Sequence, residues 1–146
     1  MRYKEFIQQV NELAETGNEK KAKQVVEAVL QTLGERLSRT ERRKLAAQLP
    51  GELKTHLHHL ERTDLFSLEE FYNRVSARCD VTYAHAVNLS RAVMQILNRA
   101  VSAGELEDIV NELPSEFEEL FGRQPESPTS PTALTTEEIR RIEKAE

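Results

Sequence analysis

The sequence predicts an all-α fold: two tandem four-helix repeats packed as one helical bundle, followed by a flexible Pro/Ser/Thr linker and a short C-terminal helix. Three observations support this prediction. The 146-residue chain has only five Gly and five Pro, and only two of the Pro, Pro50 and Pro114, come before residue 123. Apolar residues recur at the three- and four-residue spacing of amphipathic helices. The second half of the chain also repeats the pattern of the first.

The first half of the chain carries signals for four helices. We expect them at about residues 3–16, 19–37, 39–48 and 50–60. The second of these has the longest apolar stripe, which consists of Ala22, Val25, Val26, Val29, Leu30, Leu33 and Leu37. Asn18 is a favourable N-cap for this helix, and Gly17 favours the end of the helix before it. Ser38 and Glu41 match the capping box, in which the Glu carboxylate accepts the N-cap N–H.

The second half repeats this order, with helices at about residues 68–79, 83–101, 103–112 and 114–121. In the first helices, Phe6 aligns with Phe71. From Ala22 onward, which aligns with Ala86, ten of 36 aligned pairs are identical. The offset between the two halves changes by one position at the turn between the first two helices, because a deletion costs least in a turn.

The signals that begin and end helices are repeated as well. Ser102 and Glu105 repeat the capping box of the first half. Pro114 repeats Pro50, and each Pro ends one helix and begins the next. The two halves are therefore expected to share one four-helix plan.

These repeats divide the chain into a helical domain, residues 1–122, and a tail, residues 123–146. Repeat one covers residues 1–63, and repeat two covers residues 64–122. The tail begins with a Pro-, Ser- and Thr-rich stretch almost without apolar residues, so we expect a flexible linker. Its Pro recur every three residues, which also suits recognition of a polyproline II segment by a partner. The short helix that follows is marginally stable alone in water, so we expect it to be frayed or docked.

Short motifs in both repeats resemble a known family. They are Ala46-Ala47-Gln48-Leu49-Pro50, Phe66-Ser67-Leu68-Glu69-Glu70-Phe71 with Val75, Ala103-Gly104-Glu105-Leu106-Glu107-Asp108, and Leu113-Pro114-Ser115-Glu116-Phe117. In this order and spacing they resemble the bacterial family catalogued as domain of unknown function 2267, over about residues 3–121. The resemblance implies an all-helical, mostly cytoplasmic bacterial domain, and it supplies no activity and no catalytic residues. The segment from Leu57 to Leu65 departs from the family pattern because it is very polar here.

Composition excludes several classes of protein. A single Cys excludes a disulfide framework and a zinc site with several Cys ligands. The apolar runs are too short to span a membrane, and the N-terminal residues lack the apolar core of a signal peptide. The five Gly are scattered singly, so we expect no phosphate-binding loop. The prediction is a cytoplasmic protein that binds no cofactor.

Two pairs of residues are candidates for metal binding or catalysis. His56 and His59 could share a helix face, as two metal ligands require, but the sequence offers no evident third ligand. Cys79 and His85 have the residue types of a nucleophile and its base, but they lack an orienting third group. A polar helix end and a small apolar core position explain these residues more simply. We therefore expect no enzyme, and a metal- or Cys-dependent enzyme is the least favoured alternative.

The formal charge of −5 is divided unevenly along the chain. Residues 1–63 hold 12 Lys and Arg against 9 Asp and Glu, a balance of +3. Residues 64–122 hold 4 against 11, a balance of −7, and residues 123–146 hold 4 against 5, a balance of −1. The third predicted helix is basic, with Arg39, Arg42, Arg43 and Lys44. Its counterpart in repeat two is acidic, with Glu105, Glu107, Asp108 and Glu112.

These features predict a non-enzymatic protein-interaction or adaptor module. One expected contact surface is the basic helix, through Arg39, Arg42, Arg43 and Lys44. The other is the tethered terminal helix, through Ile139, Arg140, Arg141 and Ile142. The partner is a protein that the sequence does not identify, or a second copy joined through the opposite charges of the repeats.

Two alternatives remain open for the charge split. In the first, the two repeats face each other within one chain, with their opposite charges arranged around the seam between them. In the second, repeat one binds nucleic acid weakly through its Lys and Arg side chains. Among the three interpretations of the charge split, nucleic acid ranks below a protein partner and below the internal arrangement, because the net charge is negative and no recognised binding motif is present.

Overall fold

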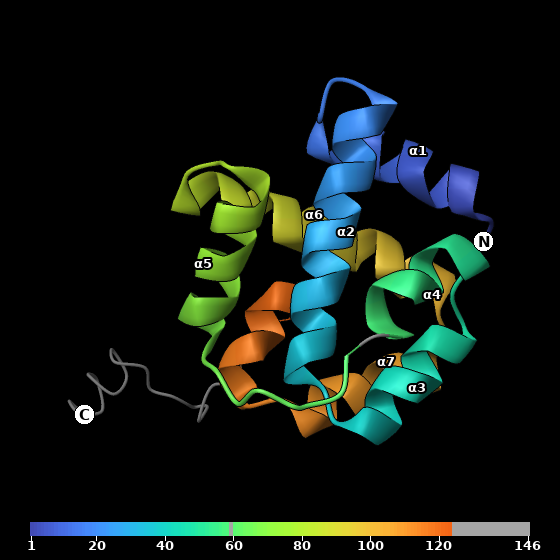
Figure 1. The fold of residues 1–146 in the computed structure, drawn as a ribbon, viewed down its shortest axis with the longest axis vertical. Helices are drawn as coiled ribbons and strands as arrows, with labels where there is room; N and C mark the ends of the chain where they lie inside the picture. The colour runs from blue at the N-terminus through green and yellow to red at the C-terminus, as the bar shows by residue number, and fades with distance from the viewer. Residues whose placement is uncertain (59, 124–146) are drawn as a thin grey trace, which may run out of the picture.

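The computed structural model describes residues 1–58 and 60–123, and this part of the chain is helical, with no strand (Figure 1). The first half contains α1 (Tyr3–Ala14), α2 (Glu19–Arg36), α3 (Arg39–Ala47) and α4 (Gly51–His58). The second half contains α5 (Leu68–Cys79), α6 (Tyr83–Ala100), α7 (Ala103–Glu112) and the 3₁₀ helix η1 (Ser115–Phe121). The predicted all-α class is confirmed, and the eight helices predicted within residues 1–122 are present, the last as a 3₁₀ helix, with ends that differ by at most two residues. The predicted C-terminal helix lies outside the described residues. Among these described residues, each helix lacks the length or the apolar character needed to span a membrane.

The turn after the first helix of each half has the same construction. The C-cap residues that follow α1 and α5 are Glu15 and Asp80, and both are left-handed, with φ of 53° and 56°. Helix α2 begins after the N-cap Asn18, and α6 begins after the N-cap Thr82. Gly17 also has positive φ, but α1 ends before it, so the expectation that Gly17 terminates this helix is wrong. These matching caps support the predicted repeat. That the two halves superpose in space stays a prediction.

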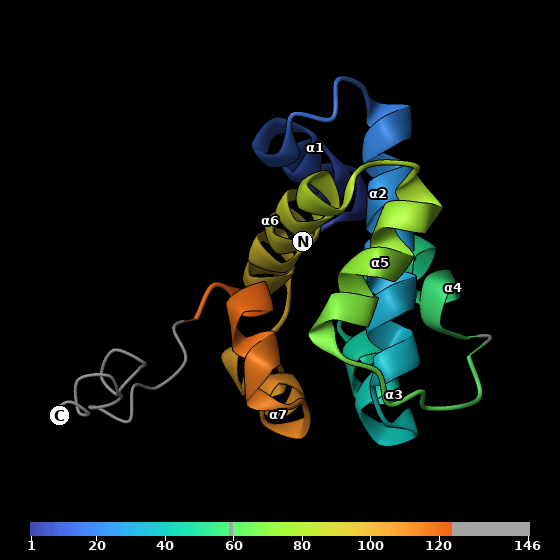
Figure 2. The same ribbon diagram turned by 90° about the vertical axis from the view of Figure 1, so that its left-hand side faces the viewer.

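The two longest helices, α2 and α6, form the centre of the bundle, and α1 and α5 each pack against both of them. Figures 1 and 2 show α1 and α5 on opposite sides of α2. Because each first helix covers the long helices of both halves, apolar residues of the two halves meet in one buried cluster. Fully buried members from both halves include Phe6, Leu33, Phe71 and Leu97. Burial of such apolar side chains is the main stabilising contribution, at about 1.5–3 kcal/mol each.

The third helices, α3 and α7, contact each other at one end of the bundle (Figures 1 and 2). Each N-cap Ser hydroxyl accepts the N–H of the Glu three residues later, as the capping box predicts. The second half of the predicted box is wrong, because the N-cap N–H groups donate to side chains of the opposite helix. The N–H of Ser38 donates to Glu112 Oε2 at 2.6 Å, and the N–H of Ser102 donates to Gln48 Oε1 at 2.7 Å. The two helix starts are therefore capped across the contact.

The polar segment between α4 and α5 is held by hydrogen bonds and ion pairs in addition to the apolar contacts of Leu60 and Phe66 with the core. The N–H of Asp64 donates to the carbonyl of Glu35 at 2.8 Å, and the Asp64 carboxylate binds Arg74 Nη2 at 2.7 Å. The Glu35 carboxylate binds Arg74 and Arg78 of α5. Burial alone would raise the pKa of Glu35, but the hydrogen bonds and charges of these two Arg hold it below its usual value.

Candidate partner-binding site

The four basic residues predicted to form a partner surface lie in three different environments. Arg39 and Arg43 are exposed on α3 and lie about one turn apart on one face. Arg42 is buried, with 3 % of its surface exposed. Lys44 binds carboxylates of α7. The exposed basic residues of α3 that form no ion pair within the described residues are therefore Arg39 and Arg43.

Arg42 joins the end of α2 to the segment after α4. Its Nη1 donates to the carbonyls of Gly34 at 2.7 Å, Leu37 at 3.1 Å and Arg62 at 3.3 Å. Carbonyls at the end of a helix lack intrahelical partners, so the guanidinium satisfies groups that α2 leaves open. Its Nη2 is buried and has no hydrogen-bond partner in the described part of the chain. Burial lowers the pKa of Arg42, and the positive charge of Arg39 lowers it further.

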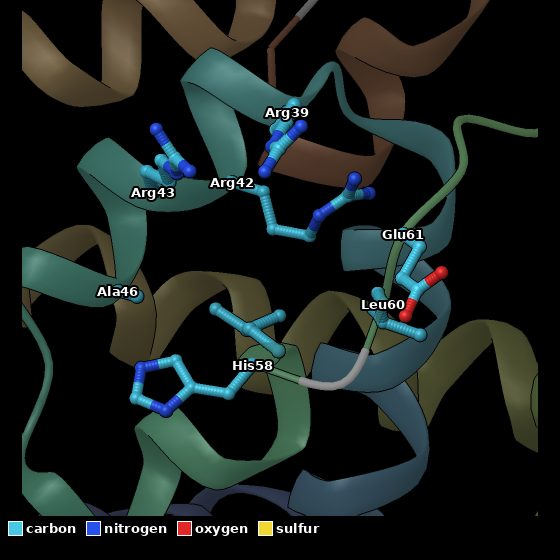
Figure 3. A pocket seen from close by; sticks show the side chains of 8 residues that line it. Arg39, Arg42, Arg43, Ala46, His58, Leu60 and Glu61 are labelled. Atoms are coloured by element: carbon cyan, nitrogen blue, oxygen red, sulfur yellow. The ribbon is translucent and has the colours of Figure 1, made fainter.

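A pocket of about 470 Å³ lies beside α3. It is lined by Arg39, Arg42, Arg43, Ala46, Leu57, His58, Leu60 and Glu61. Figure 3 shows the three Arg on α3 along one side, with His58, Leu60 and Glu61 on the opposite side. Three guanidinium groups and one carboxylate line the pocket, so it carries an excess of positive charge.

Within residues 1–58 and 60–123 this positive charge is offset only in part, by Glu61 in the lining and by the charge of Glu112, which opposes the lowering of the Arg42 pKa. Neither Arg39 nor Arg43 forms an ion pair with a residue in these ranges. Arg39 lies close enough to Arg42 to lower its pKa, which indicates an unfavourable contact between like charges. An anionic group in the pocket would relieve this repulsion and accept charge-assisted hydrogen bonds from the guanidinium groups. The chemistry that the pocket offers is therefore recognition of an anion.

Lys44 connects α3 to α7 instead of contributing to the pocket. Its Nζ lies 2.8 Å from Asp108 Oδ2, 3.2 Å from Glu41 Oε2 and 3.7 Å from Glu105 Oε1. Hydrogen bonds to Asp108 and Glu41 raise the pKa of Lys44. Lys44 and Asp108 occupy equivalent positions in the two repeats, so the opposite charges of the two halves meet here. Contacts within the chain thus explain part of the charge split.

Glu41 and Glu105 add two largely buried carboxyl groups to this contact. Their side chains are 13 % and 2 % exposed. Burial raises the pKa of Glu105 to about 7, and the neighbouring charge of Glu41 contributes to the shift. Oxygens of Glu41, Glu105 and Asp108 lie within 4.8 Å of one another, a spacing that a metal ion could use. The ammonium of Lys44 already binds all three carboxylates.

The helical region also matches a known family. A family model described as "Uncharacterized conserved protein (DUF2267)" matches residues 3–120. The chain belongs to this family. The match in this DUF2267 protein includes α1 to α7, the pocket beside α3 and the contact between α3 and α7, and it leaves out the tail. A search of the curated proteins found no match.

The residues considered for catalysis are not assembled into a site in the described part of this DUF2267 protein. Cys79 is half-buried at the end of α5, and burial raises the pKa of its thiol. A nucleophilic Cys requires the opposite shift, because the thiolate is the reactive form. His85 is exposed, and no hydrogen bond joins its side chain to Cys79. His56 is half-buried in α4, whereas His59 lies outside the described residues, so the structure does not test this candidate pair.

The predicted second surface cannot be placed in the site. Ile139, Arg140, Arg141 and Ile142 lie outside the described residues of this DUF2267 protein, as does the linker from residue 124 onward. Sequence reasoning also assigned no contact across the structure to Gln48, Glu112 or Glu61. A signal existed for the first two, because they are polar residues at equivalent positions of the two repeats, each near the end of a third helix. No local pattern indicates that Glu61 lines the pocket.

Proposed function

We propose that this DUF2267 protein is a non-enzymatic interaction module of the bacterial cytoplasm, and that the pocket beside α3 binds an acidic segment of a partner protein. The observation that carries this proposal is the positive charge of the pocket. Arg39 and Arg43 are exposed and form no ion pair within residues 1–58 and 60–123, and the guanidinium of Arg42 lies beside them. Such an arrangement is unfavourable in the unbound protein and becomes favourable when an anion binds.

An acidic peptide segment suits this pocket for two reasons. The planar guanidinium group can bind a carboxylate through two parallel hydrogen bonds, which gives geometric selectivity. Ala46, Leu57 and Leu60 add apolar surface to the lining, so an apolar side chain next to the acidic one can also be buried. The recess matters because fully exposed ion pairs contribute only about 0–1 kcal/mol. Partial removal of water strengthens the same interaction.

The tail supplies a second contact in this proposal. Its predicted terminal helix offers Ile139 and Ile142 as apolar anchors and Arg140 and Arg141 as additional positive charges. The predicted linker would tether this helix to the helical domain, and tethering raises its local concentration toward a partner that is already bound. We therefore expect both contacts to engage the same acidic protein.

Affinity capture from the native lysate tests the proposal. The intact protein is compared with the double variant R39E/R43E and with a matched control, K20E/K21E, which reverses two exposed charges on α2. We expect the wild type and the control to capture the same acidic protein, and R39E/R43E to lose it. A chain that ends at Gly122 should capture it more weakly, because the tail is missing. Capture that survives in R39E/R43E would contradict the proposed site.

Further measurements on the same variants distinguish the proposed partner from two other ligands, a second copy of the chain and nucleic acid. If the acidic partner is a second copy, sedimentation velocity will show self-association in the wild type that R39E/R43E abolishes. If the ligand is nucleic acid, labelled single-stranded or duplex oligonucleotides will bind with a steep dependence on salt concentration. Oligonucleotide binding without capture of a protein would overturn the proposed class of partner.

A further inference from the structure

The contact between α3 and α7 brings two buried carboxyl groups together. Glu41 of α3 and Glu105 of α7 lie at equivalent positions of the two halves. One oxygen of each group, Glu41 Oε1 and Glu105 Oε2, is buried and has no hydrogen-bond partner among residues 1–58 and 60–123. A buried oxygen without a donor is costly, and more so when the group is charged. The pair therefore needs a donor that the surrounding side chains do not supply.

The neighbouring charges do not neutralise this pair. Lys44 is the cation that contacts it from α3, and Asp108 is a third carboxylate on α7. Lys44 and Asp108 are 43 % and 51 % exposed and bind each other at 2.8 Å. Helix η1 also packs on α7, and its Glu116 and Glu119 bind the N–H of Leu68 and the hydroxyl of Tyr72 in α5. Helix α4 packs on α3, and its Lys54 and His58 line a recess with Arg43. With all three carboxyl groups ionised, one ammonium would face three negative charges.

We propose that Glu41 and Glu105 share one proton, and that this proton makes the contact between α3 and α7 a pH-sensitive joint between the two halves. The shared proton satisfies the pair, because a protonated carboxyl group donates to an oxygen of its neighbour. When the proton leaves to solvent, two carboxylates face each other in a buried site and repel. The contact between α3 and α7 then becomes weaker, and the N-cap hydrogen bonds that cross it open more often. This inference is independent of the proposed partner.

The transition falls near neutral pH. Burial and the charge of Glu41 raise the pKa of Glu105 to about 7, and the charge of Lys44 opposes this shift. An ordinary Glu titrates near pH 4.3 and would lose its proton well below neutrality. The joint is therefore tight in mildly acidic solution and looser in mildly alkaline solution.

Hydrogen exchange of the full-length protein, measured by mass spectrometry at about pH 5.5 and about pH 8, tests the joint. After correction for the intrinsic chemical rate, we expect the amides of α3 and α7 to open about tenfold more often at the higher pH, because one pKa unit corresponds to a tenfold change in an equilibrium. E105Q should remove this dependence, since its amide group donates permanently to Glu41. E41Q should do the same from the opposite helix. The control E27Q changes an exposed Glu of α2 and should keep the wild-type response.

Three results would overturn the inference. The first is a wild-type protein whose α3 and α7 amides exchange equally at both pH values. The second is an unchanged pH response in both E105Q and E41Q. The third comes from adding millimolar MgCl₂ or CaCl₂ at about pH 8. If either salt restores protection in the wild type but not in E105Q, the carboxyl groups hold a divalent cation instead of a proton.

Discussion

Glu112, the last residue of α7, accepts hydrogen bonds from both the N–H and the hydroxyl of Ser38, at 2.6 and 2.7 Å. Gln48 binds Ser102 in the same way, since its Oε1 accepts from the N–H at 2.7 Å and its Nε2 donates to the hydroxyl at 3.2 Å. Each half of the molecule thus caps the start of a helix in the other. This exchange releases the two capping-box carboxyl groups from their expected local role, and they face each other across the contact.

Removing the Glu112 side chain should destabilise the protein. Glu112→Ala leaves the N-cap N–H of α3 without its partner, and we expect a loss of about 1 kcal/mol in the free energy of unfolding. Glu112→Gln should retain most of this energy, because Gln48 performs the equivalent role with an amide. Urea denaturation of the three proteins measures the difference. Equal destabilisation by Ala and Gln would show that charge, and not capping, explains the effect.

Arg42 should matter for stability and not primarily for binding. Arg42→Ala leaves the carbonyls of Gly34, Leu37 and Arg62 without this donor, and we expect a loss of about 2–4 kcal/mol. Arg39→Ala, one turn earlier and exposed, should change stability by less than about 0.5 kcal/mol. Thermal unfolding compares the two variants. A small effect of Arg42→Ala would mean that water replaces the guanidinium without cost.

The raised pKa of Glu105 predicts the direction of a pH effect on stability. The folded protein holds this proton up to about pH 7, whereas the unfolded chain releases it near 4.5. The folded state therefore binds more protons between these values, and the contribution of Glu105 to stability falls as the pH rises through this window. We expect a fall of about 1–3 kcal/mol. Urea denaturation at several pH values, with E105Q as reference, measures it, and a rise with pH would contradict this account.

Arg78 should stabilise the contact between α2 and α5. Its contribution should be lost as the pH falls, whereas the contribution of Glu105 falls as the pH rises. It binds the Glu35 carboxylate at 2.8 Å and the Thr32 hydroxyl at 2.7 Å. At neutral pH we expect Arg78→Ala to cost about 1–3 kcal/mol. Since the pKa of Glu35 is lowered in the folded state, this stabilisation is present above about pH 4.5 and is lost as the pH falls through the lowered pKa.

The chemical denaturation of Arg78→Ala and the wild type at neutral and acidic pH checks this prediction. The exposed Arg91→Ala on α6 is the control, and its stability should stay within about 0.5 kcal/mol of the wild type at both pH values. A difference between Arg78→Ala and the wild type that persists unchanged in acid would exclude Glu35 as its source.

The helices follow from local patterns, and this explains why their positions were predictable. The apolar stripe that begins at Ala22 needs one buried face, and Ser38 and Ser102 satisfy the first N–H groups of their helices wherever those helices pack. The burial of Arg42 was not predictable, because it depends on residues 60–62, which lie beside it in the fold. The apolar periodicity of a helix predicts which of its faces is buried, but it does not predict which distant segment of the chain packs on that helix.

Some of the residue pairs that meet across the α3–α7 contact could be predicted from the alignment of the two repeats. Alignment places Lys44 with Asp108 and Gln48 with Glu112, which are complementary pairs. Such pairs are compatible with contact inside one chain and with contact between two copies, so the sequence does not choose between them. The structure assigns Lys44 to the internal contact and leaves Arg39 and Arg43 exposed at the pocket.

Site-specific photo-crosslinking in living cells tests the central claim most directly. A photoreactive residue is placed at Ala47, which is exposed on α3 next to the pocket, and at Ala77, which is exposed on α5. If the pocket beside α3 is the partner site, position 47 will crosslink to one acidic protein, position 77 will not, and adding R39E/R43E will abolish the adduct. The same adduct from both positions, or an adduct at position 47 that persists with R39E/R43E, would contradict the account.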